Sequence, residues 1–288
     1  MLRSLLFAPG DNQEIAEKAS ESKADGVILD LEDAVAPAKK KRARQLVAEF
    51  LDGHEEAATT ICVRINSWNH AEQITDIELV AHDAVDVVVV PMVETEREAW
   101  HTAEMVERFE TCKDATSASL FLILETAKGL ANANEIASAH EKIEMISFGL
   151  ADYTADANIR STENRAEVLT QRALLSNAAA AANVQAFDFA TLETENLDRV
   201  RADAVAARQM GYTGKAAIHP TQLEPIHEVF TPDREEIERA RKIVEAYEEA
   251  GEPGVLTVDG EMVDKPVIES ARDTLALVDE YTSSVKSE

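Results

Sequence analysis

Two carboxylates close the two most hydrophobic runs of the chain. Glu125 follows "SLFLIL" and Asp152 follows "EMISFGLA". A lone charge at the end of a buried strand is costly, so each acid is expected to have a compensating partner. Carboxylate oxygens that leave room for water and substrate oxygens are what Mg²⁺ prefers, and Mn²⁺ accepts the same ligands. The sequence therefore predicts a magnesium site at Glu125 and Asp152.

A second acidic cluster lies in the stretch "GVILDLEDAV" and contains Asp30, Glu32 and Asp33. Like charges this close raise one another's energy unless a cation, a hydrogen-bond donor or water compensates them. Arg64 ends another apolar run, "TTICVR", and offers a cation, with a structural ion pair as its alternative role. For Asp30 the alternative is a loop cap.

Eight short apolar runs could bring these groups together, because helical stretches separate them. The runs span 4–10, 26–33, 59–66, 85–93, 118–126, 144–152, 185–190 and 214–220. Their near-continuous hydrophobicity suits strands covered on both faces, as in a parallel sheet. Helical spacing of Glu, Lys, Arg and Ala predicts helices between them, for example at 38–51, 96–110 and 163–182. We therefore predict an α/β fold, a (β/α)₈ TIM barrel. A doubly wound sheet is the alternative, but no Gly-rich dinucleotide fingerprint follows the first run.

The pattern changes after residue 230. A helical stretch ends at Gly-Glu-Pro-Gly, the dipeptide Asp259-Gly260 signals a hairpin turn, and 266–283 predicts a closing helix. We expect a barrel with the active site at 1–230 and a small C-terminal arm, a helix and hairpin, at 231–288.

Active-site groups of a TIM barrel lie at the carboxyl ends of its strands. Besides the residues above, these ends include Pro9, Asp188 and His219. His219 has no partner histidine nearby and is interpreted as a structural hydrogen-bonding residue. Glu94 is assigned to a solvated rim. Lys215, at the start of the last run, is interpreted as structural, at the opposite end of the barrel.

The charge balance is extreme, with 55 acidic and 28 basic residues and a formal net charge of −27. Apolar periodicity throughout excludes an acidic disordered chain. An acidic surface repels itself until salt screens it, and the Debye length falls to about 3 Å in molar salt. We interpret the excess as adaptation to a salt-rich cytoplasm, which makes nucleic acid and anionic membranes poor partners.

Compartment and redox signals are few. Cys62 and Cys112 give neither a disulfide framework nor metal-site spacing, and Cys62 is predicted to lie in the core. The first apolar run is too short for a signal peptide, and no window has 18 continuous apolar residues. We expect a soluble cytoplasmic protein.

Seven stretches, in order over nearly the whole chain, resemble the citrate lyase β-subunit and malyl-CoA lyase group of the HpcH/HpaI aldolase superfamily. They are "LRSLLFAPGDN" (2–12), "VILDLEDAVAPAKKKRAR" (27–44), "VRIN" (63–66), "ILETAKGL" (123–130), "SFGLADY" (147–153), "GKAAIHPTQLEPIHEVF" (214–230) and "DGEMVDKPVIESAR" (259–272). The resemblance implies a TIM barrel in homotrimers or homohexamers, with Mg²⁺ as cofactor and an acyl thioester, usually of CoA, as substrate.

The resemblance also implies roles for single residues. Glu125 and Asp152 match the metal ligands, and Arg64 matches an arginine that faces the metal and the thioester carbonyl. Glu32 and Asp33 match an acidic pair that orders metal-bound water and positions Arg64. Arg3 and Pro9 are expected to contact CoA or the substrate. Asp264 is expected to be a general acid–base that the arm delivers to a neighbouring subunit. One departure is Pro91-Met92, where relatives have Pro-Lys.

These residues predict a Mg²⁺-dependent lyase that cleaves or forms a 3-hydroxyacyl-CoA such as malyl-CoA, with acetyl-CoA and a 2-oxoacid on the other side. A malyl-CoA thioesterase is the first alternative, because it needs the same metal, arginine and acid. The second is a citrate lyase β subunit that acts on an acyl-carrier-protein thioester.

Overall fold

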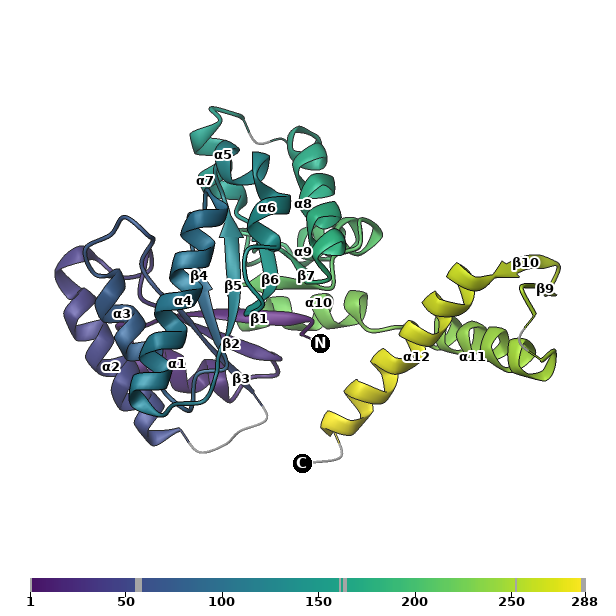
Figure 1. Cartoon of the computed structure of the whole chain (residues 1–288), viewed down its shortest axis with the longest axis horizontal. Coiled ribbons are helices and arrows are strands. Elements are labelled where there is room, and N and C mark those ends of the chain that lie inside the picture. Colours follow the sequence, from purple (N-terminus) through teal and green to yellow (C-terminus); the bar gives the residue numbers. More distant parts are fainter. Residues whose placement is uncertain (1, 55–58, 161, 163–164, 252, 286–288) are drawn as a thin grey trace. The chain divides into compact units, whose positions relative to one another are not determined.

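The computed structural model describes residues 2–54, 59–160, 162, 165–251 and 253–285. Within them, eight parallel strands close into a barrel in chain order, and the first strand pairs with the last (Figure 1). The TIM-barrel prediction is confirmed, and each predicted apolar run overlaps one strand. The strands are β1 (Ser4–Pro9), β2 (Gly26–Asp30), β3 (Thr60–Arg64), β4 (Val87–Val90), β5 (Ser119–Leu124), β6 (Ile143–Phe148), β7 (Gln185–Asp188) and β8 (Gly214–Ala217).

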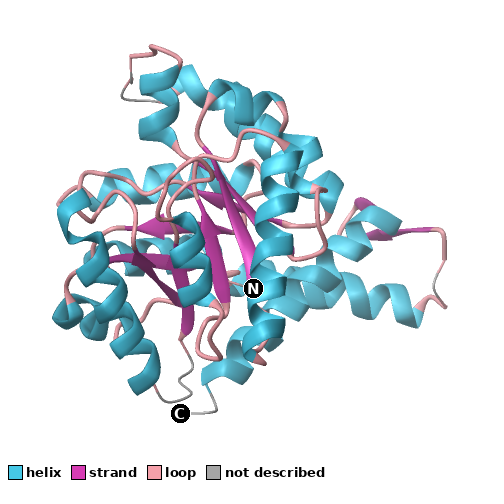
Figure 2. Cartoon of the chain, turned by 60° about the vertical axis from the view of Figure 1, so that its left-hand side comes forward, coloured by secondary structure: helices cyan, strands magenta, loops and turns pink. Residues whose placement is uncertain are grey.

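Helices surround these strands (Figure 2). Those of the barrel are α1 (Gln13–Ser20), α2 (Lys40–Gly53), α3 (Gln73–Val80), α4 (Glu96–Lys113), α5 (Ala127–Ala131), α6 (Ala133–Ala137), α7 (Leu150–Asp156), α8 (Leu169–Ala182), α9 (Leu197–Gln209) and α10 (Leu223–Phe230). The predictions at 38–51 and 96–110 correspond to α2 and α4. The helix predicted at 163–182 begins later, at Leu169 after a 3₁₀ turn, and residues 163–164 lie outside the described residues.

None of the described helices combines the length and apolar character needed to cross a bilayer.

The inside of the barrel is filled by apolar side chains from alternate strand positions. They include Leu5, Ile28, Cys62, Val89, Phe121, Met145 and Phe187. Cys62 is a fully buried part of this core, as predicted, and burial raises the pKa of its thiol above the usual range. Because side chains close the barrel interior, a small molecule has room at the ends of the strands and in their loops.

Charged groups are buried on the outer side of β7 and β8, against the helices. Asp188 is fully buried and accepts hydrogen bonds from Arg172 of α8 and Lys215 of β8, at 3.0 and 2.8 Å. Asp188 therefore does not join the acids of the rim, and the prediction that placed it among the active-site strand ends is wrong. Lys215 is structural as interpreted, but its Nζ contacts Asp188 and the Phe189 carbonyl oxygen, at the carboxyl end of β7. Its charge thus lies nearer the active-site end than expected.

The described chain divides into two compact units, one within residues 2–227 and one within residues 228–285. In the second unit, α11 (Arg234–Glu249) begins with a capping box of Asp233 and Glu236. The strands β9 (Val255–Val258) and β10 (Glu261–Asp264) form the hairpin predicted at Asp259-Gly260, whose φ angles of 51° and 84° fit a tight left-handed turn. The helix α12 (Lys265–Val285) closes the chain. Its helix and hairpin pattern follows the prediction for the arm.

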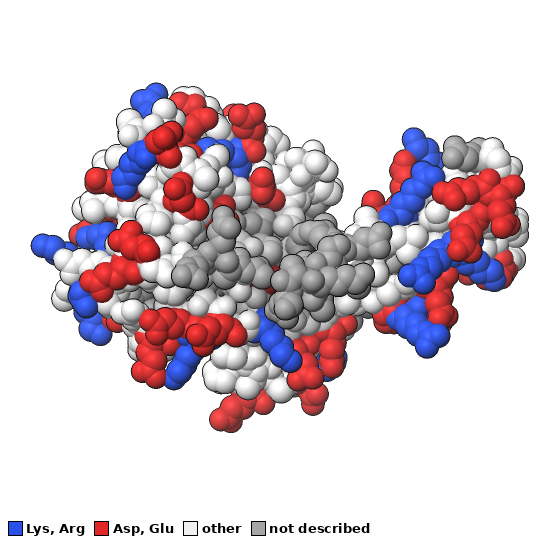
Figure 3. Space-filling view, turned by 90° about the horizontal axis from the view of Figure 1, so that it is seen from below, with Lys and Arg blue, Asp and Glu red and all other residues white. Residues whose placement is uncertain are grey.

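Acidic side chains crowd the face of both units that Figure 3 shows, with fewer basic ones among them. We expect the melting temperature to rise as KCl is raised from about 0.1 M to about 2 M, because screening relieves the repulsion of a net charge of −27. Circular dichroism melts across this series measure the effect. A melting temperature independent of KCl would contradict the prediction of salt adaptation.

Candidate active site

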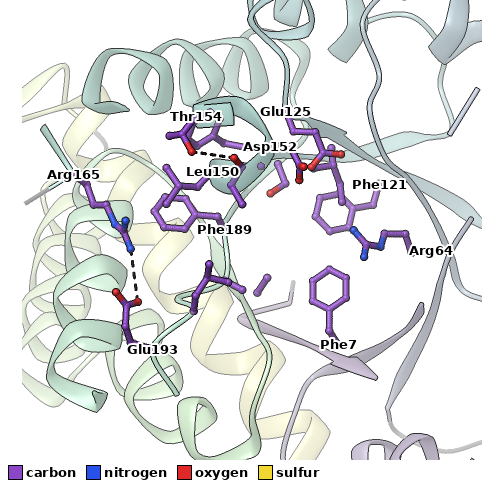
Figure 4. Close-up of a pocket in the computed structure, with 18 residues that line it drawn as sticks. Phe7, Arg64, Phe121, Glu125, Leu150, Asp152, Thr154, Arg165, Phe189 and Glu193 are labelled. Atoms are coloured by element: carbon purple, nitrogen blue, oxygen red, sulfur yellow. Dashed lines mark hydrogen bonds and ion pairs between the residues drawn. The ribbon is translucent and has the colours of Figure 1, made fainter. Parts of the chain in front are cut away.

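A cavity of about 480 Å³ opens at the carboxyl ends of the barrel strands. Its lining includes Arg64 from the end of β3, Glu125 just after β5 and Asp152 from the first turn of α7 (Figure 4). Phe7, Phe121, Phe148, Leu150 and Phe189 supply apolar walls. The strand ends thus bring charged groups far apart in the sequence into one pocket, as the barrel prediction required.

Asp30 holds the guanidinium of Arg64. Arg64 donates from Nε to Asp30 Oδ1 at 2.8 Å and from Nη2 to Oδ2 at 2.5 Å. Asp30 is 1% exposed, and it also accepts the backbone N–H groups of Glu32 and Ala34. It therefore caps the loop, as its alternative role predicted, and in addition fixes the orientation of Arg64. The ring of Phe7 lies 5.0 Å from the guanidinium carbon and supports the same orientation.

Glu32 and Asp33, predicted to act as a pair, have different positions. Glu32 Oε2 lies 3.0 Å from Arg64 Nη1, and burial, opposed by Arg64 but reinforced by neighbouring acids, raises the pKa of Glu32 to about 7. Asp33 is exposed, and its carboxylate makes no ion pair with any described residue. Asp30 and Glu32, and not Asp33, are therefore the acids that position Arg64.

Glu125 is the most constrained acid of the cavity. It is 4% exposed, and its Oε1 accepts the Met92 N–H at 2.9 Å. Burial first, then the charges of Asp152 and Glu32, raise the pKa of Glu125 to about 8 against the opposing effects of the Met92 N–H and Arg64. A Cβ atom at Gly149 would lie 2.4 Å from Glu125 Oε2, so glycine at this position leaves the carboxylate its space.

Met92 reaches Glu125 through a rare backbone conformation. Its φ of 57° lies in the left-handed region, which a residue with a side chain seldom adopts. Strain of this kind is kept where the surrounding structure fixes it, and here it accompanies an N–H group aimed at Glu125. The residue that departs from the Pro-Lys pattern of relatives therefore contributes through its backbone.

Asp152 is exposed, in contrast to the burial assumed for it from the sequence. It lies in the first turn of α7, just after β6, instead of ending the strand itself, so its charge is solvated at the rim. Its charge still raises the pKa of Glu125, which indicates that the two carboxylates are close.

The residues fit a hard divalent cation. Glu125 lines the cavity, its Oε2 has no hydrogen-bond partner among the described residues, and Asp152 adds a second carboxylate. The positive charge of Arg64 is already compensated by Asp30, so the acids of the cavity share an uncompensated negative charge. Carboxylate oxygens with space for water are the donor set of Mg²⁺.

Five predicted site residues are not among those that line the cavity: Glu32 and Asp33, described above, and Arg3, Pro9 and Asp264. Arg3 precedes β1 at the amino end of the barrel and is paired with Asp25, with Nη2 2.6 Å from Oδ1. Pro9 ends β1 beside the rim. Asp264 ends β10 and belongs to the C-terminal unit. Their contacts with CoA or substrate stay predictions.

His219 is a structural residue, as interpreted. Its Nδ1 lies 2.8 Å from the Thr221 hydroxyl and accepts the Thr221 N–H, so the ring caps a 3₁₀ turn.

Sequence reasoning missed Asp30 as the anchor of Arg64, and it missed Arg165 and Glu193, which line the cavity from loops. The carboxyl end of β2 could have indicated Asp30, whereas no motif marks Arg165.

Asp30→Asn is expected to lower turnover by about 10- to 100-fold, because half of the bidentate pair that orients Arg64 is lost. Asp33→Asn, the matched control within the loop that Asp30 caps, should keep most of the activity because Asp33 is exposed. Steady-state kinetics of both variants measure the difference. Equal losses would restore the sequence-based assignment of Asp33.

Comparisons with known proteins identify a family for this chain. The model of the family "HpcH/HpaI aldolase/citrate lyase" matches residues 3–220. The citrate lyase subunit beta of Haemophilus influenzae is 32% identical over 274 residues, which cover 94% of each chain. The (3S)-malyl-CoA thioesterase of Cereibacter sphaeroides is 34% identical over 276 residues, covering 95% of this chain and 93% of that protein.

Among solved structures, the protein CitE of Mycobacterium tuberculosis in complex with magnesium, acetoacetate and coenzyme A superposes with a TM-score of 0.78. It is 29% identical, and the match covers 96% of this chain and 97% of that one. The likeness extends over both units.

Proposed function

The chain belongs to the HpcH/HpaI aldolase/citrate lyase family of lyase-type enzymes, and from this premise we propose the reaction that its cavity supports. The reaction is Mg²⁺-dependent cleavage or formation of a 3-hydroxyacyl-CoA such as malyl-CoA, between acetyl-CoA and a 2-oxoacid. The observation that carries the proposal is the cavity in which Arg64, fixed by Asp30, faces the carboxylates of Glu125 and Asp152.

Glu125 and Asp152 would hold the metal ion. When bound, Mg²⁺ supplies Lewis-acid polarisation of substrate oxygens next to the bond that breaks. Glu32, beside Arg64, is placed to accept hydrogen bonds from water at the site.

Arg64 supplies the positive charge for the thioester. An arginine has five N–H donors, and Nε and one Nη2 donor of Arg64 are used by Asp30. Nη1 lies beside Glu32, and the donors that these two acids leave free can donate to the thioester carbonyl oxygen, where negative charge develops as the carbon–carbon bond breaks and an enolate forms. A donor fixed in advance stabilises such charge without having to reorganise during the reaction.

Asp264 is proposed as the general acid–base that takes the 3-hydroxyl proton, delivered by the C-terminal unit of a neighbouring copy in a homotrimer or homohexamer. Asp264→Asn is expected to abolish turnover while fold and Mg²⁺ binding persist, because the amide cannot accept the proton. Activity, calorimetric Mg²⁺ titration and circular dichroism measure the three properties. Retention of more than about a tenth of wild-type turnover would contradict the general-base role.

Two alternatives share this cavity. The 34% identical thioesterase favours hydrolysis of malyl-CoA, in which water attacks the thioester carbonyl. The 32% identical citrate lyase subunit beta favours action on a carrier-protein thioester inside a larger complex. In the first case Asp264 would activate water instead of deprotonating a hydroxyl.

The products decide between them. Purified protein is incubated with malyl-CoA and Mg²⁺ in about 2 M KCl, a concentration that screens the acidic surface. Glyoxylate is trapped with phenylhydrazine, and free thiol is followed separately with a chromogenic disulfide. Glyoxylate without thiol supports the lyase, and thiol without glyoxylate supports the thioesterase. If neither glyoxylate nor thiol forms, both activities on malyl-CoA are contradicted, and the carrier-protein reaction is favoured.

A further inference from the structure

Arg165 is a buried cation in the wall of the cavity, away from the acids that hold Arg64. It lies between α7 and α8, and its side chain is only 10% exposed. Figure 4 shows Arg165 and Glu193 across the cavity from Arg64 and Phe7, with Phe189 and Leu150 between. The cavity therefore has a cationic group on two sides and an apolar wall along its length.

The hydrogen-bonding groups of Arg165 are poorly satisfied. Its Nε is buried without a hydrogen-bond partner, and its ion pair with Glu193 spans 3.8 Å between Nη2 and Oε2, which exceeds hydrogen-bond length. Glu193 is itself about half exposed, so solvent weakens this pair. By contrast, Arg64 makes two hydrogen bonds to the buried Asp30. The nearby charge of Glu167 also attracts Arg165, but no described residue accepts a side-chain hydrogen bond from it, and a buried guanidinium without such acceptors is costly to keep.

The surroundings of Arg165 hold the side chain in place nonetheless. Its φ of 54° is left-handed, and the 3₁₀ turn Ala166–Val168 starts directly after it. The guanidinium carbon lies 5.7 Å from the centre of the Phe189 ring, which itself faces the cavity. The backbone of Phe189 is in turn tied to Lys215 through its carbonyl oxygen. The cation is thus positioned before any ligand arrives.

We propose that Arg165 binds an anionic oxygen group of the substrate, at the end of the ligand away from Glu125 and Asp152. This inference rests on the proposed function, because it assumes that the substrate occupies the cavity with its reacting end at those carboxylates. The anion is a carboxylate of the 2-oxoacid or acyl group, or a phosphate of CoA. Both offer the planar or tripodal oxygens that a guanidinium recognises.

Paired ligands separate these two sources. In the presence of Mg²⁺, calorimetry gives the affinity ratio of oxaloacetate to pyruvate, which differ by one carboxylate, and that of CoA to pantetheine, which differ by the phosphates. Arg165→Gln is expected to reduce one of the two ratios by about tenfold or more, because a charge-assisted hydrogen bond is lost. Loss in the first ratio identifies the carboxylate, and loss in the second identifies the phosphate.

Three further variants act as controls. Arg165→Lys should restore part of the affected ratio, since the charge is kept. Arg160→Gln changes an exposed arginine of the same loop that does not line the cavity, and should leave both ratios unchanged. Glu193→Gln removes the competing carboxylate and should raise the affected ratio.

Both ratios unchanged in a folded Arg165→Gln variant would overturn the inference. If that variant does not fold, a Glu193→Gln variant with unchanged ratios would overturn it equally. Binding is measured without turnover, so a wild-type protein that binds these ligands but releases neither product contradicts only the proposed reaction. Wild-type ratios near one for both pairs would contradict the role of Arg165 but not the proposed reaction.

Discussion

Glu125→Gln is expected to abolish measurable Mg²⁺ binding and to lower turnover by about 10³-fold, the effect of losing several kcal/mol of Lewis-acid stabilisation. The amide keeps the size of the side chain and can still accept the Met92 N–H, so the fold should persist. Calorimetric Mg²⁺ titration and steady-state kinetics measure the two losses. Glu94→Gln is the matched control, because Glu94 follows a neighbouring strand but pairs with Lys128 outside the cavity. A Glu125→Gln variant that binds Mg²⁺ as the wild type does would refute the assigned ligand.

Without bound metal, Glu125→Gln is expected to change how the stability of the protein depends on pH. Because the pKa of Glu125 is raised from 4.5 to about 8 in the folded protein, the folded state binds more protons than the unfolded state between these values. The free energy of unfolding of the chelated wild type should therefore fall as pH rises from about 5 to 8. Glu125→Gln removes this contribution and should make the profile less steep, while the raised pKa of Glu32 keeps part of the slope. Melting temperatures in EDTA across this range measure it, and parallel profiles would contradict the electrostatic cost assigned to Glu125.

Arg64→Gln is expected to lower turnover by about 10²–10³-fold, because a fixed donor to the developing enolate oxygen is removed. It should also destabilise the protein by about 3–5 kcal/mol, since Asp30, 1% exposed, would keep a buried charge without its ion-pair partner. Kinetics and urea unfolding measure the two effects.

The double variant Asp30→Asn with Arg64→Gln separates these roles. Neutralising Asp30 removes the unpaired charge, and one amide oxygen can still accept a loop N–H group. The double variant should regain most of the lost stability but none of the lost turnover. Recovery of turnover would show that Arg64 acts only by balancing Asp30.

The sequence by itself determined the barrel, because eight apolar runs spaced by helical stretches can bury themselves on both faces in few other ways. It also predicted that Arg64 and Glu125 lie at the carboxyl ends of the strands, where the structure has them lining the cavity. The hairpin at Asp259-Gly260 followed from local turn chemistry alone.

Only the tertiary structure decided which acid serves which partner. Asp30, Glu32 and Asp33 are neighbours in the chain, yet strand pairing and the turn after β2 direct Asp30 to Arg64 and leave Asp33 exposed. Asp188 resembles Glu125 as an acid at a strand end, but it points outward to Arg172 and Lys215 because alternate strand residues face opposite sides. Arg165 carries no sequence signal, because its place in the cavity depends on packing between a loop and Phe189 that spacing along the chain does not encode.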